Sequence, residues 1–262
     1  MIGALRALES RNDIRARANL IERIAELKTN DRPEDELDDG ESTVLESTDC
    51  ALAQNKSNVA ALAELRSVTS VCTKCPHLAA FRHTVVFGVG NPNADLMFVG
   101  EAPGVDEDLK GEPFVGRAGE LLTKIIQTMG FERSDVYIAN VLKCRPDMPT
   151  GAPGNRQPTE EEMSNCLPYL RQQIDLIKPK VMVALGGVAM RGLFGTNEPM
   201  KNLRGRWHSF GSVPVMATFH PSYLLRNQAL TEKRKVWEDM LLVLERIGRN
   251  ITERQRNYFL KG

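Results

Sequence analysis

The segment Asp95-Leu96-Met97-Phe98-Val99-Gly100-Glu101-Ala102-Pro103-Gly104 decides the fold of this chain. Its first half is an apolar run typical of a strand buried on both faces, and its second half is a turn rich in glycine and proline. Similar apolar runs occur at 136–142, 180–186 and 213–219. Helical patterns separate or follow these runs, at 116–129, 159–178, 188–194 and 232–249. The alternation predicts an α/β fold with a mostly parallel sheet that helices cover on both faces.

The first 58 residues differ from the rest of the chain in composition. Residues 3–28 have apolar side chains at helical spacing and predict an amphipathic helix. Residues 31–49 hold nine acidic side chains and one basic side chain, so they are predicted to form a disordered linker. A helix over 59–70 then begins the body. We therefore divide the chain into an extension (1–58), a globular domain (59–250) and a C-terminal tail (251–262).

Composition is typical of a soluble globular protein, with 42% hydrophobic and 26% charged residues in a chain of 262. No stretch is apolar for long enough to span a bilayer, and the N-terminus lacks the apolar core of a secretory signal. We therefore expect a cytoplasmic protein that does not contact membranes. The formal net charge is zero, but residues 1–58 carry 8 basic and 13 acidic side chains. The remaining body is basic, which is compatible with binding to nucleic acid.

Four of the five cysteines form a pattern typical of a metal site. Cys72 and Cys75 form a CxxC pair, and Cys144 and Cys166 follow far downstream. Four thiolates are enough for one tetrahedral site, which would hold either zinc or an iron–sulfur cluster. In a reducing compartment such cysteines bind metal more often than they form disulfides. The fifth cysteine, Cys50, lies in a polar stretch and has no predicted role.

Polar side chains follow three of the four predicted strands. Glu101 follows the first, Asn140 closes the second, and His220 follows the fourth. The carboxyl ends of parallel strands meet at one edge of a sheet, where α/β proteins bind ligands, so we expect these three residues to converge on one cleft. Phe114 lies between two glycines and is either a core residue or an aromatic ring that stacks on a planar ligand.

Five short motifs occur in a characteristic order along the chain. They are G-E-A-P-G at 100–104, G-E-P-F-V-G at 111–116, N-V-L-K-C-R-P at 140–146, N-R-Q-P at 155–158 and H-P-S at 220–222. Together with the four cysteines they resemble the family 4 uracil-DNA glycosylases, over residues 65–248. The resemblance implies a three-layer α/β/α fold with a central four-stranded parallel sheet. It also implies a [4Fe-4S] cluster on Cys72, Cys75, Cys144 and Cys166.

The same resemblance implies excision of uracil that has been flipped out of DNA. Phe114 would stack on the uracil ring, and the backbone at Ala102 would contribute to the pocket. Asn140 would pair with the uracil edge and reject cytosine, which presents the opposite donor and acceptor pattern. His220 would donate to uracil O2 as the glycosidic bond breaks. Glu101 is the candidate for orienting the attacking water.

Further roles are assigned with the same resemblance. Asp108 is a second, weaker candidate for orienting the water. The residues predicted to contact DNA are Ser222, Arg226, Lys143 and Arg145. One side chain of the 221–226 segment would fill the gap left by the flipped base. The candidates for this role are Tyr223, Leu224 and Leu225.

Residues 147–154 form a loop rich in proline and glycine that lengthens the spacing between Cys144 and Cys166. A related branch binds uracil-DNA irreversibly through a histidine in a loop inserted at this place. No histidine occurs between His83 and His208, which disfavours that route. Two competing hypotheses stay open, a non-catalytic sensor of uracil in DNA and a metal-clipped structural accessory of a polymerase. We expect a nucleoid-associated monomer that binds uracil-containing DNA, with a protein partner for residues 1–58.

Overall fold

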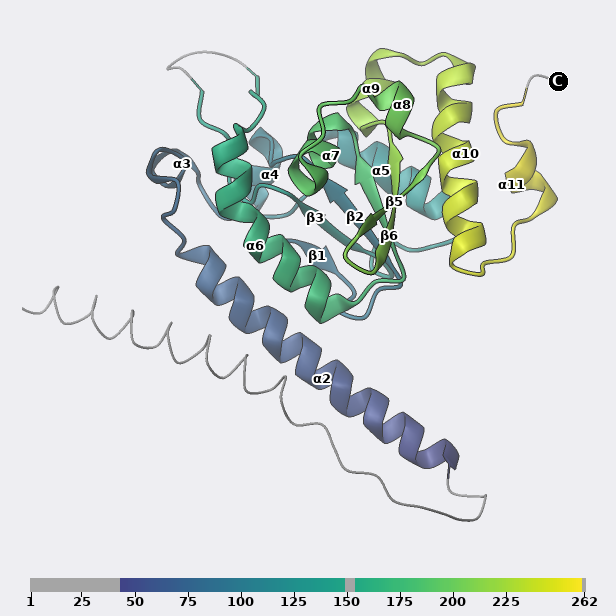
Figure 1. Cartoon of the computed structure of the whole chain (residues 1–262), viewed down its shortest axis with the longest axis horizontal. Coiled ribbons are helices and arrows are strands. Elements are labelled where there is room, and N and C mark those ends of the chain that lie inside the picture. Colours follow the sequence, from purple (N-terminus) through teal and green to yellow (C-terminus); the bar gives the residue numbers. More distant parts are fainter. Residues whose placement is uncertain (1–42, 149–153, 261–262) are drawn as a thin grey trace, which may run out of the picture. The chain divides into compact units, whose positions relative to one another are not determined.

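The computed structural model describes residues 43–148 and 154–260 and has a six-stranded sheet at its centre (Figure 1). The strand order is β1-β3-β2-β4-β6-β5. The four central strands run parallel: β3 (Tyr137–Asn140), β2 (Leu96–Gly100), β4 (Val181–Leu185) and β6 (Val213–Thr218). Each of them lies inside one of the four apolar runs. The predicted four-stranded parallel sheet is therefore confirmed as the centre of the observed sheet.

Two short antiparallel strands extend the sheet beyond the prediction. They are β1 (Val89–Gly90), which pairs with β3, and β5 (Trp207–Phe210), which pairs with β6. Both are edge strands, and neither is fully buried. Because an edge strand needs no continuous apolar run, the sequence pattern does not reveal it.

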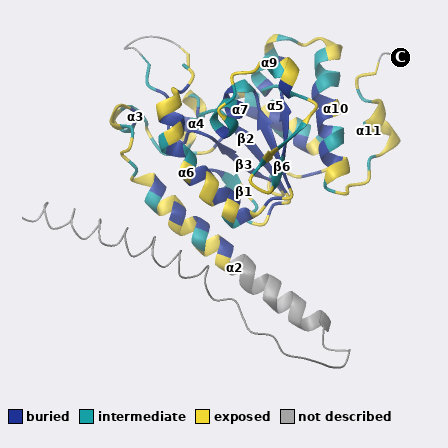
Figure 2. Ribbon diagram, in the orientation of Figure 1, coloured by how far each residue is buried: buried dark blue, intermediate teal, exposed yellow. Residues whose placement is uncertain are grey.

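Strand side chains alternate between two cores, one on each face of the sheet. In β2, Leu96 and Phe98 enter one core, and Met97 and Val99 enter the other. Figure 1 shows α6 (Glu160–Ile177) and α10 (Leu230–Arg246) on opposite sides of the strands, and Figure 2 shows the central strands as buried. The first core packs against α5 (Arg117–Thr128) and α10 (Leu230–Arg246), and the second against α3 (Pro76–Phe81), α6 (Glu160–Ile177) and α7 (Gly187–Phe194). The three-layer α/β/α architecture is thus confirmed.

Local signals explain where several helices begin. Thr159 and Glu162 form the predicted capping box at the start of α6, because Glu162 N donates to Thr159 Oγ1 and Thr159 N donates to Glu162. His220 is the N-cap of α9 (Pro221–Arg226), so this helix begins within the fifth motif. The remaining short helices are α4 (Val105–Lys110), α8 (Met200–Leu203), α9 (Pro221–Arg226) and α11 (Glu253–Asn257).

The N-terminal prediction requires one correction. Helix α2 spans Thr43–Ser70, so residues 43–49 are helical and do not belong to a disordered linker. The composition did not separate the two alternatives, because a run of acidic residues can belong to a helix as well as to a linker. The predicted helix over 3–28 and residues 31–42 lie outside the described residues. The division into residues 1–58, 59–250 and 251–262 stays a prediction.

The described end of the chain packs against α10. The rings of Trp237 and Tyr258 lie 5.4 Å apart, and Trp237 Nε1 donates to the Gln255 carbonyl at 2.6 Å. Within 43–148 and 154–260, no helix has both the length and the apolar character needed to cross a membrane.

Candidate active site and cysteine centre

A cleft of about 530 Å³ opens at the carboxyl end of the parallel strands. Hydrogen bonds extend the strand pairing to this edge, since Val141 N donates to Gly100 O at 3.0 Å and Gly186 N donates to Thr218 O at 2.8 Å. The segments that follow the four strands therefore leave the sheet together. The cleft is lined by residues from these segments, including Glu101, Ala102, Asn140, Gly186 and His220, and by Phe114.

Phe114 forms part of the cleft wall in a left-handed backbone conformation, with φ of 55°. This conformation is costly for a residue other than glycine, so the surrounding chain must hold it in place. The centre of its ring lies 5.6 Å from that of His220. Gly100 makes room for the ring, because a Cβ there would lie 2.5 Å from Phe114 and would also collide with Asn140. The aromatic ring is thus fixed beside the two polar residues.

Glu107 holds the loop that carries Phe114, and the sequence analysis did not identify it. One carboxylate oxygen accepts hydrogen bonds from Val115 N and Gly116 N, both at 3.0 Å. The other oxygen accepts from Gly104 N at 3.1 Å, so Glu107 also satisfies the backbone N–H of the residue that caps the start of α4. A glutamate three residues after an N-cap is a signal that sequence analysis could have used. Glu107 therefore ties the turn after β2 to the Phe114 loop.

Asn140 lies at the end of β3 and is 2% exposed. Among the described residues, its Oδ1 atom has no hydrogen-bond partner. A buried acceptor without a partner costs about 1–3 kcal/mol, and such atoms are rare in folded proteins. An amide that lines a cleft with one acceptor unpaired is suited to a ligand that supplies an N–H group.

His220 is arranged as a neutral hydrogen-bond donor. Its Nδ1 atom accepts hydrogen bonds from Ser222 N at 3.1 Å and from Ser222 Oγ at 2.8 Å. Burial lowers the pKa of His220 to about 4, and the positive charge of Arg226 acts in the same direction. The imidazole is therefore neutral at physiological pH. Because Nδ1 accepts, the proton resides on Nε2. Gly186 allows the close approach of this residue, since a Cβ at Gly186 would lie 3.0 Å from the His220 Cβ.

Glu101 and Ala102 line the same cleft, directly after β2. Burial raises the pKa of Glu101 to about 7, against the opposing charge of Arg191. A carboxyl group with a pKa near neutrality can both release and accept a proton under physiological conditions. Arg191 was not identified from the sequence, and no motif marks it.

The structure does not bring Asp108 to the cleft. Its side chain is fully buried and accepts hydrogen bonds from His83 N at 3.0 and 3.1 Å and from His83 Nδ1 at 2.8 Å. Asp108 therefore anchors the chain at residue 83 to α4. The interpretation of Asp108 as a second water-orienting residue needs correction, because the side chains of successive helical residues point in different directions and that of Asp108 points into the interior.

The predicted DNA contacts divide into two groups. Ser222 and Arg226 line the cleft, and Arg226 is exposed. Arg145 donates to the Gly154 carbonyl at 3.2 Å at the protein surface. Lys143, in contrast, is 1% exposed, so it cannot contact a phosphate. Burial lowers the pKa of its ammonium group to about 8, which leaves it charged at neutral pH.

Of the three candidates for filling the gap in the base stack, one is excluded by burial. Leu224 is 5% exposed and belongs to the interior. Tyr223 donates from its hydroxyl group to Glu232 Oε2 at 3.0 Å, and its ring packs 4.6 Å from that of Phe219. Leu225 is partly exposed and lines a separate apolar groove with Trp237.

The four cysteines Cys72, Cys75, Cys144 and Cys166 gather in one place. Cys144 and Cys166 belong to one hydrophobic core, and Cys72 and Cys75 pack against it. The Arg82 guanidinium contacts both Cys144 and the Cys72 carbonyl, the latter at 2.7 Å. Burial raises the pKa of the Cys75, Cys144 and Cys166 thiols, and a negative charge on Cys72 acts in the same direction. None of the four forms a disulfide. N–H groups surround the sulfur atoms. Arg82 donates to Cys144 at 3.1 Å, Lys143 N donates to Cys166 at 3.2 Å, and Asn165 Nδ2 donates to Cys75 at 3.7 Å. Such donors stabilise thiolate ligands, so the set fits a bound metal centre.

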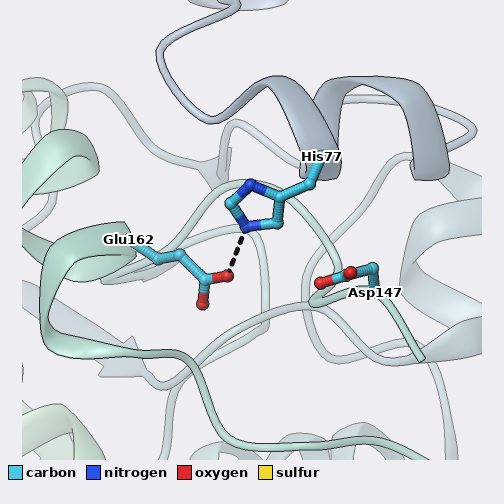
Figure 3. A group of neighbouring side chains, drawn as sticks. All are labelled: His77, Asp147 and Glu162. Carbon is cyan, nitrogen blue, oxygen red and sulfur yellow. Dashed lines mark hydrogen bonds and ion pairs between the residues drawn. The ribbon is translucent and has the colours of Figure 1, made fainter. Parts of the chain in front are cut away.

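A second group of ligand-type side chains lies next to the cysteines. Figure 3 shows His77, Asp147 and Glu162 converging, with a hydrogen bond of 2.8 Å from His77 to Glu162. The Arg156 guanidinium already bonds to both carboxylates, to Glu162 at 2.6 and 2.9 Å. Burial alone would raise the pKa of Glu162, but these hydrogen bonds lower it to about 2. The group is therefore an ion-pair network in which arginine takes the place of a metal ion.

Comparisons with known proteins agree with this geometry. The sequence model of the Uracil DNA glycosylase superfamily matches residues 87–241. The Type-4 uracil-DNA glycosylase of Thermotoga maritima is 47% identical over 173 residues, which cover 64% of this chain and 85% of that protein. The corresponding protein of Archaeoglobus fulgidus is 44% identical over 172 residues, or 62% of this chain and 82% of that protein. The Type-4 uracil-DNA glycosylase of Sulfurisphaera tokodaii is 40% identical over 210 residues, which cover 77% of this chain and 91% of that protein.

The segment matched by the superfamily model, residues 87–241, includes the cleft and its polar residues from Glu101 to His220. The resemblance carried by the five motifs is therefore confirmed over most of the domain. Together with the three-layer fold, it shows that the chain belongs to the uracil DNA glycosylase superfamily and, within it, to the type-4 family.

Proposed function

We propose that this protein removes uracil from DNA by hydrolysing the N-glycosidic bond, which leaves an abasic site. The observation that carries the proposal is the buried, unpartnered Oδ1 of Asn140 in a cleft next to the Phe114 ring. Uracil offers an N–H group at N3, whereas cytosine offers an acceptor there. A site with a buried acceptor rejects a ligand that lacks the matching donor, because the acceptor then stays unpaired.

Uracil enters this cleft as a flipped nucleotide. Its ring stacks on Phe114, which Glu107 holds in place through the hydrogen bonds to Val115 and Gly116. The Asn140 amide pairs with N3–H and O4. The turn at Ala102 closes the pocket, and the exposed Arg226 is available for the DNA backbone near the flipped nucleotide. Ser222 holds the tautomer of His220, and Arg145 supplies a further basic group at the surface.

Bond breaking places positive charge on the sugar and negative charge on the departing uracil. The neutral Nε2–H of His220 donates a hydrogen bond to uracil O2 and stabilises the anion without transferring the proton. The Glu101 carboxylate orients a water molecule and accepts its proton as the oxygen bonds to C1′. The electron pair of the broken bond leaves with uracil, which then takes a proton from solvent.

We further propose that the four cysteines hold a [4Fe-4S] cluster. Among the described residues, no three of the four sulfur atoms lie within 4.8 Å of one another. A tetrahedral zinc site has Zn–S bonds of about 2.3 Å, which would place the sulfur atoms roughly 3.8 Å apart. A cluster with one cysteine on each iron fits the wider arrangement better. When bound, it joins three separate segments of the chain and has a structural role.

The chain matches most of the length of relatives that are named uracil-DNA glycosylases. The two competing hypotheses, a non-catalytic sensor and a structural accessory of a polymerase, are therefore not favoured. We propose that the protein acts as a monomer on uracil-containing DNA at the nucleoid. We also propose that the extension, residues 1–58, binds a protein partner.

The proposal is tested by incubating anaerobically purified protein with matched oligonucleotides that contain uracil, cytosine or thymine at one position. We expect alkali-sensitive abasic sites to form at uracil alone. Abasic sites at cytosine, or none at uracil, would contradict the proposal. Visible absorption together with iron and zinc analysis of the same preparation tests the cluster separately, because a zinc protein is colourless.

A further inference from the structure

Lys143 is one of the largest fully buried side chains of the described chain, although lysine is normally exposed. Its Nζ atom donates to the Asn140 main-chain carbonyl at 2.9 Å and to Gln173 Oε1 at 2.5 Å. Both acceptors are neutral. Within 43–148 and 154–260, no carboxylate forms an ion pair with this ammonium group. A buried cation without a counter-charge is costly, so this residue needs an explanation.

Gln173, one of the two neutral acceptors of Lys143, is itself held in place by hydrogen bonds. Gln173 is fully buried, and its Nε2 atom donates to the Phe87 carbonyl at 3.0 Å and to the Tyr137 hydroxyl at 2.9 Å. These two bonds fix its Oε1 atom as an acceptor for Lys143. The ammonium group is therefore held in one position by the strand that ends at Asn140 and by helix α6.

The main chain of Lys143 lies against the cysteine site. The main-chain N–H of Lys143 donates to Cys166 Sγ at 3.2 Å, and Cys144 is the next residue along the chain. Four thiolates that bind a metal centre carry a concentrated negative charge. The same residue thus contacts a cysteine sulfur through its backbone and the base-reading asparagine through its side chain.

We propose that Lys143 is a positioning residue that ties Asn140 to the cysteine site: its ammonium group fixes the Asn140 carbonyl, and the thiolate ligands balance its charge. The role of Asn140 in this inference rests on the proposed function. The cysteine centre then contributes to base recognition without touching the base. A lysine that contacted DNA phosphates, as the sequence analysis predicted for Lys143, would neither fix the Asn140 carbonyl nor balance the charge of the thiolates.

The test uses the full chain with its metal centre and the variant Lys143→Met, which keeps an unbranched side chain, one atom shorter, and removes the ammonium group. Binding is measured to two oligonucleotides, one with 2′-fluoro-deoxyuridine, whose glycosidic bond resists hydrolysis, and one with an abasic site. We expect about a tenfold or larger loss of affinity for the uracil analogue, because the Asn140 carbonyl loses a charged partner, and unchanged affinity for the abasic DNA. We also expect faster release of iron to a chelator.

Two further variants complete the design. Lys180→Met removes an exposed lysine that pairs with Asp95 and should change neither measurement. Lys143→Gln keeps a hydrogen-bond donor without the charge. It should recover part of the affinity for the uracil analogue but still release iron faster, and it serves if Lys143→Met does not fold.

An equal loss of affinity on both DNAs, or an unchanged rate of iron release in the Lys143 variants, would overturn the inference. Failure of the proposed function is recognised separately, because wild-type protein would then not release uracil from an unmodified substrate. Iron release reports on Lys143 in either case.

Discussion

Replacing Glu101 by glutamine is expected to stabilise the folded protein above neutral pH while slowing uracil excision. Burial raises the pKa of Glu101 from 4.5 to about 7. Between these values the folded state binds more protons than the unfolded state, so stability falls as the pH rises through this window. Each pKa unit corresponds to about 1.4 kcal/mol, so the full cost above pH 7 is at most about 3.5 kcal/mol. Glutamine has no charge to desolvate and avoids this cost.

The same pKa sets the expected pH dependence of excision. Only the carboxylate form of Glu101 can accept a proton from water, so kcat/KM should rise about tenfold per pH unit below about pH 7 and then level off. His220 adds no second limb in this range, because burial lowers its pKa to about 4. Glu101→Gln should lose this limb, and its rate should fall about 10²- to 10⁴-fold, the usual contribution of a general base.

Both consequences can be measured on the same samples. Single-turnover excision is followed between about pH 5 and about pH 8.5, and melting temperatures are recorded at one heating rate in the same buffers. The variant should melt up to roughly 10 °C higher than wild type near pH 8, with little difference near pH 5. Glu132→Gln alters an exposed glutamate and serves as the control. A wild-type rate without an acid limb, or a variant that melts like wild type near pH 8, would refute the reasoning.

Three other substitutions test separate parts of the site. His220→Ala should retain binding of uracil-DNA but lower the single-turnover rate about 10²- to 10³-fold, because the leaving anion loses its donor; a rate within threefold of wild type would argue against that role. Asn140→Asp should relax the choice between uracil and cytosine, measured as the ratio of the two excision rates, and an unchanged ratio would exclude Asn140 as the reader of the base edge. Glu107→Gln should raise KM more than it lowers kcat, because a weaker acceptor loosens the Phe114 loop; a change in kcat alone would contradict this positioning role.

The sequence predicts the centre of the fold well because buried parallel strands leave a strong signal. The four apolar runs form β2, β3, β4 and β6 in the predicted sheet. The edge strands β1 and β5 were not predicted, because partly exposed strands of two and four residues have no distinct periodicity.

The sequence predicted those residues of the candidate site that lie at the carboxyl ends of the parallel strands. Asn140 and His220 line one cleft because parallel strands bring their carboxyl ends together. Lys143 was wrongly predicted to face DNA, because composition gives no information on the direction of a side chain three residues beyond a strand. The predicted role of Asp108 was wrong for a similar reason, because the sequence does not show that its side chain points into the interior. Glu107 was missed although its capping-box spacing is visible, because a cap and a loop anchor have the same sequence signal.

The most direct test of the central claim is the amount of free uracil released per molecule of anaerobically purified protein from a labelled uracil-containing oligonucleotide. The site predicts release of many uracil molecules per protein molecule, with an equal number of abasic sites in the DNA. Tight binding of the oligonucleotide without free uracil would contradict catalysis and would favour a protein that only senses uracil in DNA.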